Sequence, residues 1–293
     1  MVISMLFGGL GNQMFQYAAG KSLARKNGTE LLLDLEVQDR YPLHFGFELA
    51  SVFQCTPEIA GKDQVGDIIG WRNTYHIKNR LLKDSYRFFR GKNFVVEPHF
   101  HFWNGFFSLP DKKYIAGYWQ SEKYFSAISD EIRNDFQFSP ALESLDYEVA
   151  NSMDQCGSVS VHIRRGDYIS NKDTNALLGV CPVDYYDRAI AYIAERVVNP
   201  CFYFFSDDIA WVRRTFSLPF QSRFVDHNSG RQSFNDMRLM SLCRHHIIAN
   251  SSFSWWGAWL GRNGDKTVIA PRRWFRRDIK DPKDICPDSW VLL

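Results

Sequence analysis

The sequence predicts an α/β protein with two domains, and three observations lead to this prediction. The chain opens with a short apolar strand, a glycine-rich turn and a helical run. A strand near the middle, Val159–Ile163, has charged residues at its carboxyl end. After it, strands and helices alternate, the pattern of a parallel sheet covered by helices. The length of 293 residues suffices for two domains of ordinary size.

The opening strand, residues 2–7, runs into the turn Gly8-Gly9-Leu10-Gly11-Asn12-Gln13, and a helix is expected from Met14 to about Lys26. Backbone N–H groups at the start of such a helix can face an anion. The turn is not a P-loop, and Met14 stands where a dinucleotide-binding motif has its third glycine. A tight turn that packs helix on strand explains the glycines about as well. The candidate ligand contacts here are Gly9, Gly11, Asn12 and Gln13.

Regular patterns are scarce in the rest of the first half. Glu30–Asp34 is expected to form a strand and residues 77–90 a basic helical stretch, but residues 41–118 otherwise follow no period. His99 and His101 could share one face of a strand. Because no third ligand is in view, we expect no metal site there.

Two helices are expected to close the first half. Ser121 caps an amphipathic helix that runs to Phe136, and Ser139-Pro140 begins another that reaches about Asp154. Gln155–Ser158 then breaks the pattern. We place the domain boundary there.

The charged end of the central strand is the strongest functional signal. His162, Arg164, Arg165 and Asp167 gather within six residues, just before an expected turn. In an open parallel sheet the carboxyl ends of strands line the ligand crevice, so two arginines predict an anionic ligand, most simply a phosphate or diphosphate. The competing interpretation is a surface cluster of salt bridges.

A second candidate anion site follows the expected strand Ile247–Ala249. The run Asn250-Ser251-Ser252-Phe253-Ser254 leads into a helix that begins about Trp255. Hydroxyls and unpaired N–H groups at a helix start attract anions, although ordinary capping by Ser254 is the alternative.

Acidic side chains complete the polar set. Asp207 and Asp208 follow the buried strand Cys201–Phe205, and Asp236 lies on a later helix. Ionised carboxylates only accept hydrogen bonds, so they suit the donors of a ribose or of guanine. A Mg²⁺ site is the competing view, but no Asp-x-Asp is present and the two arginines already supply positive charge.

Composition limits the classes of partner. With 35 basic and 33 acidic residues the net charge is +2, too balanced for a nucleic-acid-binding protein. The six cysteines form no CxxC pair, so we expect free thiols in a reducing compartment. The sequence shows no signal peptide and no window of about 20 apolar residues. We expect a cytoplasmic protein with at most a peripheral membrane contact.

Three motifs, in this order, closely resemble those of the α-1,2-fucosyltransferases of glycosyltransferase family 11. They are Gly8–Ala18, His162–Tyr168 and Asn250–Gly257. The resemblance implies a GT-B-like fold with two Rossmann-type domains that face a central cleft. Residues 1–155 would form the acceptor-side α/β domain and residues 156–275 the GDP-fucose-binding domain. The tail, residues 276–293, is expected to pack back on the first domain.

The resemblance also implies a reaction. L-Fucose would pass from GDP-L-fucose to the 2-hydroxyl of a terminal galactoside, with inversion and without a metal or other cofactor, in synthesis of a bacterial surface glycan. By analogy Arg164 binds the diphosphate, Asp236 the guanine and Ser251 or Ser252 a phosphate, while His162 lies against the nucleotide. The full set of expected donor contacts is Gly9, Gly11, Asn12, Gln13, Arg164, Arg165, Asp207, Asp236, Ser251, Ser252 and Phe253.

Two questions stay open at this point. Asp167 and His162 are the candidates for the base that takes the acceptor proton, and late proton loss to solvent is the alternative. Another GDP-sugar transferase, or a non-catalytic glycan- or nucleotide-binding protein on the same fold, are the other functions to weigh. Intact Arg164, Arg165, Asp236 and Ser252 argue against a degenerate site.

Overall fold

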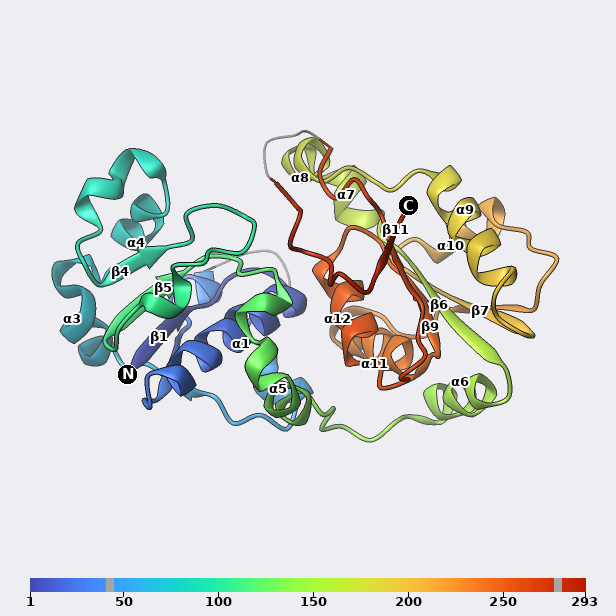
Figure 1. Ribbon diagram of the computed structural model, residues 1–293, viewed down its shortest axis with the longest axis horizontal. Helices are drawn as coiled ribbons and strands as arrows, with labels where there is room; N and C mark the ends of the chain where they lie inside the picture. Colours follow the sequence, from blue (N-terminus) through green and yellow to red (C-terminus); the bar gives the residue numbers. More distant parts are fainter. Residues whose placement is uncertain (41–44, 277–280) are drawn as a thin grey trace. The chain divides into compact units, whose positions relative to one another are not determined.

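The computed structural model describes residues 1–40, 45–276 and 281–293, and the chain forms two compact α/β units (Figure 1). The first unit comprises Met1–Pro140 and Lys283–Ile285, and the second comprises Ala141–Pro282 and Cys286–Leu293. The boundary thus falls after Pro140 rather than near residue 155. The physical reason is helix α6, Ser144–Asp154, which packs on the second unit's β6 and α11.

The first unit contains a parallel sheet in the order β3-β2-β1-β5-β4. Its strands are β1 Val2–Met5, β2 Leu31–Asp34, β3 Glu58–Ile59, β4 Phe94–Val96 and β5 Lys113–Ala116. Its helices are α1 Leu10–Lys26, α2 Leu49–Val52, α3 Lys62–Ile69, α4 Tyr75–Leu81 and α5 Ser129–Asp135. The strand, glycine turn and helix expected at the start of the chain are confirmed as β1 and α1.

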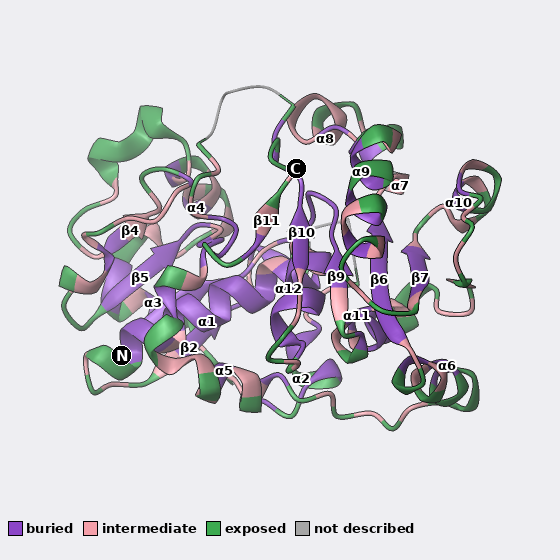
Figure 2. Cartoon of the chain, turned by 45° about the vertical axis from the view of Figure 1, so that its right-hand side comes forward, coloured by how far each residue is buried: buried purple, intermediate pink, exposed green. Residues whose placement is uncertain are grey.

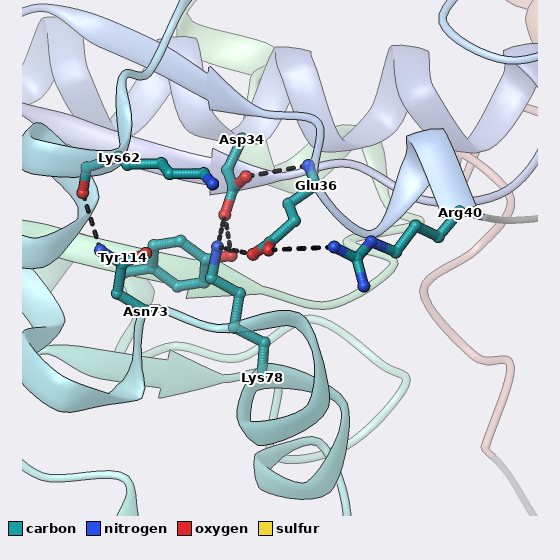
Figure 3. A network of polar contacts seen from close by, with 7 residues as sticks. All are labelled: Asp34, Glu36, Arg40, Lys62, Asn73, Lys78 and Tyr114. Atoms are coloured by element: carbon teal, nitrogen blue, oxygen red, sulfur yellow. Dashed lines mark hydrogen bonds and ion pairs between the residues drawn. The ribbon is translucent and has the colours of Figure 1, made fainter.

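A buried ion-pair network fastens α4 to this sheet (Figure 3). Lys78 of α4 is 1% exposed, and its ammonium contacts Asp34 at the end of β2 and, at 2.8 Å, Glu36. The hydroxyl of Tyr114, on β5, donates to Asp34 Oδ2 over 2.7 Å. Because each charge has a partner, the desolvation cost of burying them is offset.

Several expectations for the first half need correction. The basic stretch at residues 77–90 is not one helix: α4 ends at Leu81, and a 3₁₀ turn covers Asp84–Phe89. Ser121 does accept from Lys123 N, at 3.3 Å, but two 3₁₀ turns precede α5 instead of a continuous helix. His99 and His101 stack with ring centroids 3.7 Å apart, outside any strand.

The second unit has six parallel strands in the order β11-β10-β9-β6-β7-β8. They are β6 Gly157–Ile163, β7 Pro200–Ser206, β8 Ser222–Val225, β9 His245–Ile247, β10 Val268–Ala270 and β11 Val291–Leu292. After α6, its helices are α7 Gly166–Ser170, α8 Lys172–Leu177, α9 Val183–Ala194, α10 Ile209–Thr215, α11 Phe234–Leu242 and α12 Ser252–Leu260.

This strand order is the Rossmann order. The chain moves outward from β6 through β7 to β8, then returns to β9 on the other side of β6. The central strand β6 is buried along its whole length (Figure 2). In such sheets ligands bind at the carboxyl ends of the strands where the order reverses, which here is the pair β6 and β9.

The tail departs from its expected place. Only Lys283–Ile285 belongs to the first unit, where Asp284 accepts from Phe102 N at 3.1 Å. Residues 286–293 return to the second unit, because β11 pairs with β10 and extends that sheet. Residues 277–280 lie outside the described part.

The six cysteines are free thiols. Among the described residues, no helix has both the length and the apolar character to cross a bilayer.

Candidate functional site

The segments after β6 and β9 lie side by side at the reversal point of the second sheet. Tyr168, on α7, donates its hydroxyl hydrogen to the carbonyl oxygen of Asn250 over 2.9 Å. The rings of His162 and Phe253 approach with centroids 5.7 Å apart. The arginine segment and the start of α12 are therefore held together.

Arg164 is the arginine that this arrangement presents at the reversal point. Its Nη1 lies 3.1 Å from Asp207 Oδ2, and its guanidinium lies 5.9 Å from the ring centroid of Tyr168. Asp207 Oδ1 also accepts from Arg165 N at 2.8 Å. Both carboxylate oxygens of Asp207 have partners inside the protein, so this residue holds the Arg164 side chain, and its expected contact with the donor nucleotide stays a prediction.

Arg165 makes a different set of contacts. Its guanidinium stacks 3.6 Å above the ring of Trp211, and its Nε lies 3.2 Å from Asp208 Oδ2. Asp208 Oδ1 in turn caps α10 by accepting from Trp211 N at 3.2 Å. The salt-bridge interpretation therefore describes Arg165 and Asp208, whose contacts hold the strand ends together.

The start of α12 is open to an anion. Ser251 is the N-cap residue, and its side chain makes no capping hydrogen bond. Ser254 does not cap the helix either, because its hydroxyl is buried and points back to the carbonyls of Ala249 and Ser251. Ser252 and Phe253, in the first turn, are half-buried. First-turn N–H groups have no intrahelical acceptor, and the helix dipole adds positive potential there.

Asn250 fixes the backbone in front of α12. Its buried amide donates to the carbonyl oxygens of Leu178, Gly179 and Trp274 over 3.0–3.1 Å. Asn250 thus holds the loop in place through its side chain.

His162 supplies an unused polar atom beside Arg164. Its side chain is buried, and its Nδ1 has no hydrogen-bond partner among the described residues. Burial, together with the charge of Arg164, lowers the pKa of His162 to about 3. The imidazole is therefore neutral near pH 7, and it is a poor proton acceptor. The side chain of Asp167, the other candidate base, lies outside the described part of the structure.

Asp236 belongs to a polar cluster beyond β8. The amide of Asn228 donates to Asp236 Oδ1 at 3.0 Å and to the buried Asp146 Oδ1 at 2.9 Å. His227 Nε2 lies 2.8 Å from the same Asp146 oxygen. Burial, reinforced by the negative charge of Asp146, raises the pKa of Asp236 to about 7.

Sequence reasoning missed the other three members of this cluster. Asp146 gave no signal, because it lies on a helix that we assigned to the first domain. His227 and Asn228 did have one, since they lie two and three residues after the end of β8, and polar residues after parallel strands line the ligand edge.

The glycine turn of the first unit is built around two amides. Gly8 has φ of +90°, and a Cβ at this position would lie 2.7 Å from Asn12 Nδ2. The buried Gln13 donates to the carbonyls of Gly8 and Gly46 and accepts from Glu48 N. Gln13 thus holds the loop, and its expected contact with the donor stays a prediction. Asn12 Oδ1 accepts from Gln120 at 2.7 Å. Gly9 is the N-cap residue of α1 and is half-buried, and Gly11 in the first turn is buried.

Within the described ranges no group of three or more His, Cys, Asp or Glu side chains is placed to hold a metal ion. Arg164 and the α12 dipole supply positive charge at the reversal point.

Comparison with known proteins places this geometry in context. Residues 1–293 match the family described as glycosyl transferase family 11. The chain is 37% identical to an alpha-1,2-colitosyltransferase of Escherichia coli, over 100% of this chain and 99% of the relative. It is 26% identical to the galactoside 2-alpha-L-fucosyltransferase SEC1 of Bos taurus, over 97% of this chain and 71% of the relative.

Among solved structures, the fucosyltransferase NodZ from Bradyrhizobium superposes with a TM-score of 0.50 at 16% identity, over 87% of this chain and 90% of that one. The GT-B-like fold of two α/β units that the motifs implied is confirmed.

Proposed function

Because the chain belongs to glycosyl transferase family 11, we propose that it transfers L-fucose from GDP-L-fucose to the 2-hydroxyl of a terminal galactoside. The observation that carries this proposal is that Arg164 and the start of α12, which has no side-chain cap, follow the paired strands β6 and β9 at the reversal point of a Rossmann-type sheet. A guanidinium and a helix N-terminus together form a strong diphosphate site.

The nucleotide is assigned to the same unit. The diphosphate contacts Arg164 and the N–H groups of Ser252 and Phe253. Nδ1 of His162, which has no hydrogen-bond partner among the described residues, is assigned as a polar contact to the nucleotide. Asp236 accepts from the N1–H and N2–H₂ groups of guanine, which present two adjacent donors to one carboxylate.

The chemistry is a single displacement with inversion. As the bond from the fucosyl carbon to the phosphate oxygen breaks, negative charge grows on the leaving GDP. Arg164 and the α12 amides stabilise that charge in place, a contribution of a few kcal/mol for each well-placed donor. In other nucleotide-sugar transferases a divalent cation stabilises the charge on the leaving diphosphate. Here Arg164 and the α12 amides supply that positive charge, so we expect transfer without a metal.

The acceptor proton must leave the 2-hydroxyl oxygen as it bonds to fucose. The low pKa of His162 makes it a weak base, so Asp167 is the remaining candidate side chain, with late proton loss to solvent as the alternative.

A second donor deserves a test, because the colitosyl relative is more similar in sequence than the fucosyl one. Colitose lacks the 3-hydroxyl of L-fucose. A site that pairs that hydroxyl through buried groups discriminates strongly against the deoxy sugar, whereas a site that leaves it in water accepts both.

Release of GDP from GDP-fucose, with and without lactose and in EDTA, tests the proposal. We expect lactose-dependent release that survives the chelator and disappears with a 2-deoxygalactoside acceptor. A parallel reaction with GDP-colitose ranks the two donors by kcat/KM. Tight GDP binding without release on any galactoside would reject the acceptor class and leave the phosphate site standing. Failure to bind GDP would reject the whole assignment.

A further inference from the structure

Four large aromatic side chains of the first unit point into solvent on two neighbouring 3₁₀ turns. Phe88 is 83% exposed, Trp71 60%, Phe89 56% and Tyr86 38%. The turns are Gly70–Arg72 and Asp84–Phe89. Residues 83–89 are exposed without interruption after α4 (Figure 2). Isolated exposed apolar residues are ordinary, but a contiguous aromatic group marks an interaction surface.

Basic side chains alternate with these rings. The guanidinium of Arg72 lies 4.7 Å from the ring centroid of Trp71, and that of Arg87 lies 4.9 Å from the ring centroid of Phe88. Arg72 Nε donates to the carbonyl of Phe89, which joins the two turns. We call this surface the aromatic-basic patch, and define it as Trp71, Arg72, Lys83, Arg87, Phe88 and Phe89.

The patch is preformed rather than loose. Arg90, 15% exposed, donates to the carbonyls of Leu81 and Leu82 and so ties the second turn to the end of α4. Arg90 also pairs with Asp84 at 3.3 Å. That contact partly neutralises the one acidic residue in the segment 71–92.

The charge of this segment stands apart from the rest of the chain. Residues 71–92 contain seven Lys or Arg and one Asp, a net charge of +6, whereas the whole chain carries +2. The remaining residues are therefore net negative. One of the seven cations, Lys78, is buried in the ion-pair network, and most of the others are exposed.

We propose that the aromatic-basic patch docks the first unit on a bilayer that contains anionic phospholipids. Aromatic rings enter the headgroup and upper acyl region, and Lys and Arg between them meet lipid phosphates. A soluble polyanion would use the cations but leave Phe88 and Phe89 in water. Charge complementarity and exposed rings on one surface together favour the lipid.

Vesicle sedimentation of the full chain tests this. The probes are vesicles of phosphatidylcholine alone and vesicles with about one-third phosphatidylglycerol, each at low and high salt. We expect binding to the anionic vesicles, weakened by salt and at least tenfold weaker to the neutral ones. A soluble polyphosphate at equal charge concentration is the competing ligand.

Two double variants separate the contributions. F88S/F89S removes the rings, and we expect roughly a tenfold loss of vesicle affinity, with its matched control L145S/Y147S on exposed residues of α6 unchanged. K83Q/R87Q removes two charges, and we expect a loss of roughly tenfold or more, with R214Q/R262Q unchanged. GDP release with a water-soluble acceptor is expected to stay at the wild-type rate in all four, so docking is read separately from turnover.

Three results would overturn the proposal. The first is no binding to the anionic vesicles, and the second is equal vesicle binding by the patch variants and their controls. The third is polyphosphate binding as tight as vesicle binding, with no loss of polyphosphate affinity in F88S/F89S. The last would assign the surface to a soluble polyanion.

Discussion

Arg164 and Asp207 follow the neighbouring strands β6 and β7, and the two side chains meet with Nη1 and Oδ2 3.1 Å apart. Room for this pair depends on Gly166, where a Cβ would lie 2.7 Å from Asp207 Oδ2. A side chain at position 166 would therefore crowd the carboxylate that pairs with Arg164.

Gly166→Ala should displace Asp207 and with it Arg164. We expect kcat for GDP release to fall at least tenfold while the protein stays folded, because misplacement of one transition-state contact is costly. The matched control is Gly264→Ala, where a Cβ meets nothing within 4 Å. Equal activity of the two variants would show that Asp207 does not position Arg164.

The adjacent arginines should respond differently to alanine. Arg164→Ala removes the proposed diphosphate contact, and we expect a loss of about 10²–10³ in kcat. Arg165→Ala removes the contacts to Trp211 and Asp208, so we expect about 1 kcal/mol of lost stability with most turnover retained. Kinetics and urea unfolding of both variants check this. Near-wild-type turnover of Arg164→Ala would end the phosphate assignment.

Donor affinity should depend on pH through Asp236. Guanine binding needs the ionised carboxylate, and the pKa of Asp236 in the free protein is about 7. We therefore expect GDP to bind about tenfold more tightly at pH 8 than at pH 6, measured by calorimetry. Asp236→Asn should bind weakly at both pH values. A flat wild-type profile would place guanine elsewhere.

The same raised pKa has a consequence for stability. The folded state holds this proton more tightly than the unfolded chain does, so the contribution of Asp236 is fully present below about pH 4. It is lost as the pH rises through about 7. Urea unfolding between pH 4 and 8 should show this decline in the wild type and a smaller one in Asp236→Asn.

The buried network of the first unit should be intolerant of a single change. Lys78→Met leaves Asp34 and Glu36 without their ammonium partner, and we expect a loss of about 3 kcal/mol or more in urea unfolding. The double variant D34N/K78M should recover part of the loss, because it no longer buries the Asp34 charge unpaired. A double variant less stable than Lys78→Met would contradict the ion-pair account.

The second unit could be predicted from sequence because two of its strands, β6 and β7, have seven residues each and are followed by charged residues. The β6 segment alternates regularly and ends in two arginines, and β7 is a continuous apolar run. The pattern could not tell Arg164 from Arg165, because the two differ in their partners after β7. Arg164 pairs with Asp207, whereas Arg165 contacts Asp208 and Trp211 of α10.

Residues 40–120 resisted the same reasoning for a physical reason. Strands β3 and β4 have two and three residues, too few to show a period of two. The expected helix after Ser121 breaks because Phe125 leaves the helical backbone region, at φ of −142°, with its ring near that of Phe15. Tertiary packing overrides the local pattern there.

The path of the chain also constrains how the protein assembles. Lys283–Ile285 belongs to the first unit, yet the residues on both sides of it belong to the second. In this segment the carboxylate of Asp284 accepts hydrogen bonds from Phe102 N and from the ammonium of Lys123. Synthesis runs from the amino terminus, so the first unit must wait for nearly the entire second unit to be made before it gains these bonds. Folding of the two units is thereby interleaved, and a fragment cut after Pro140 would lack a piece of its own structure.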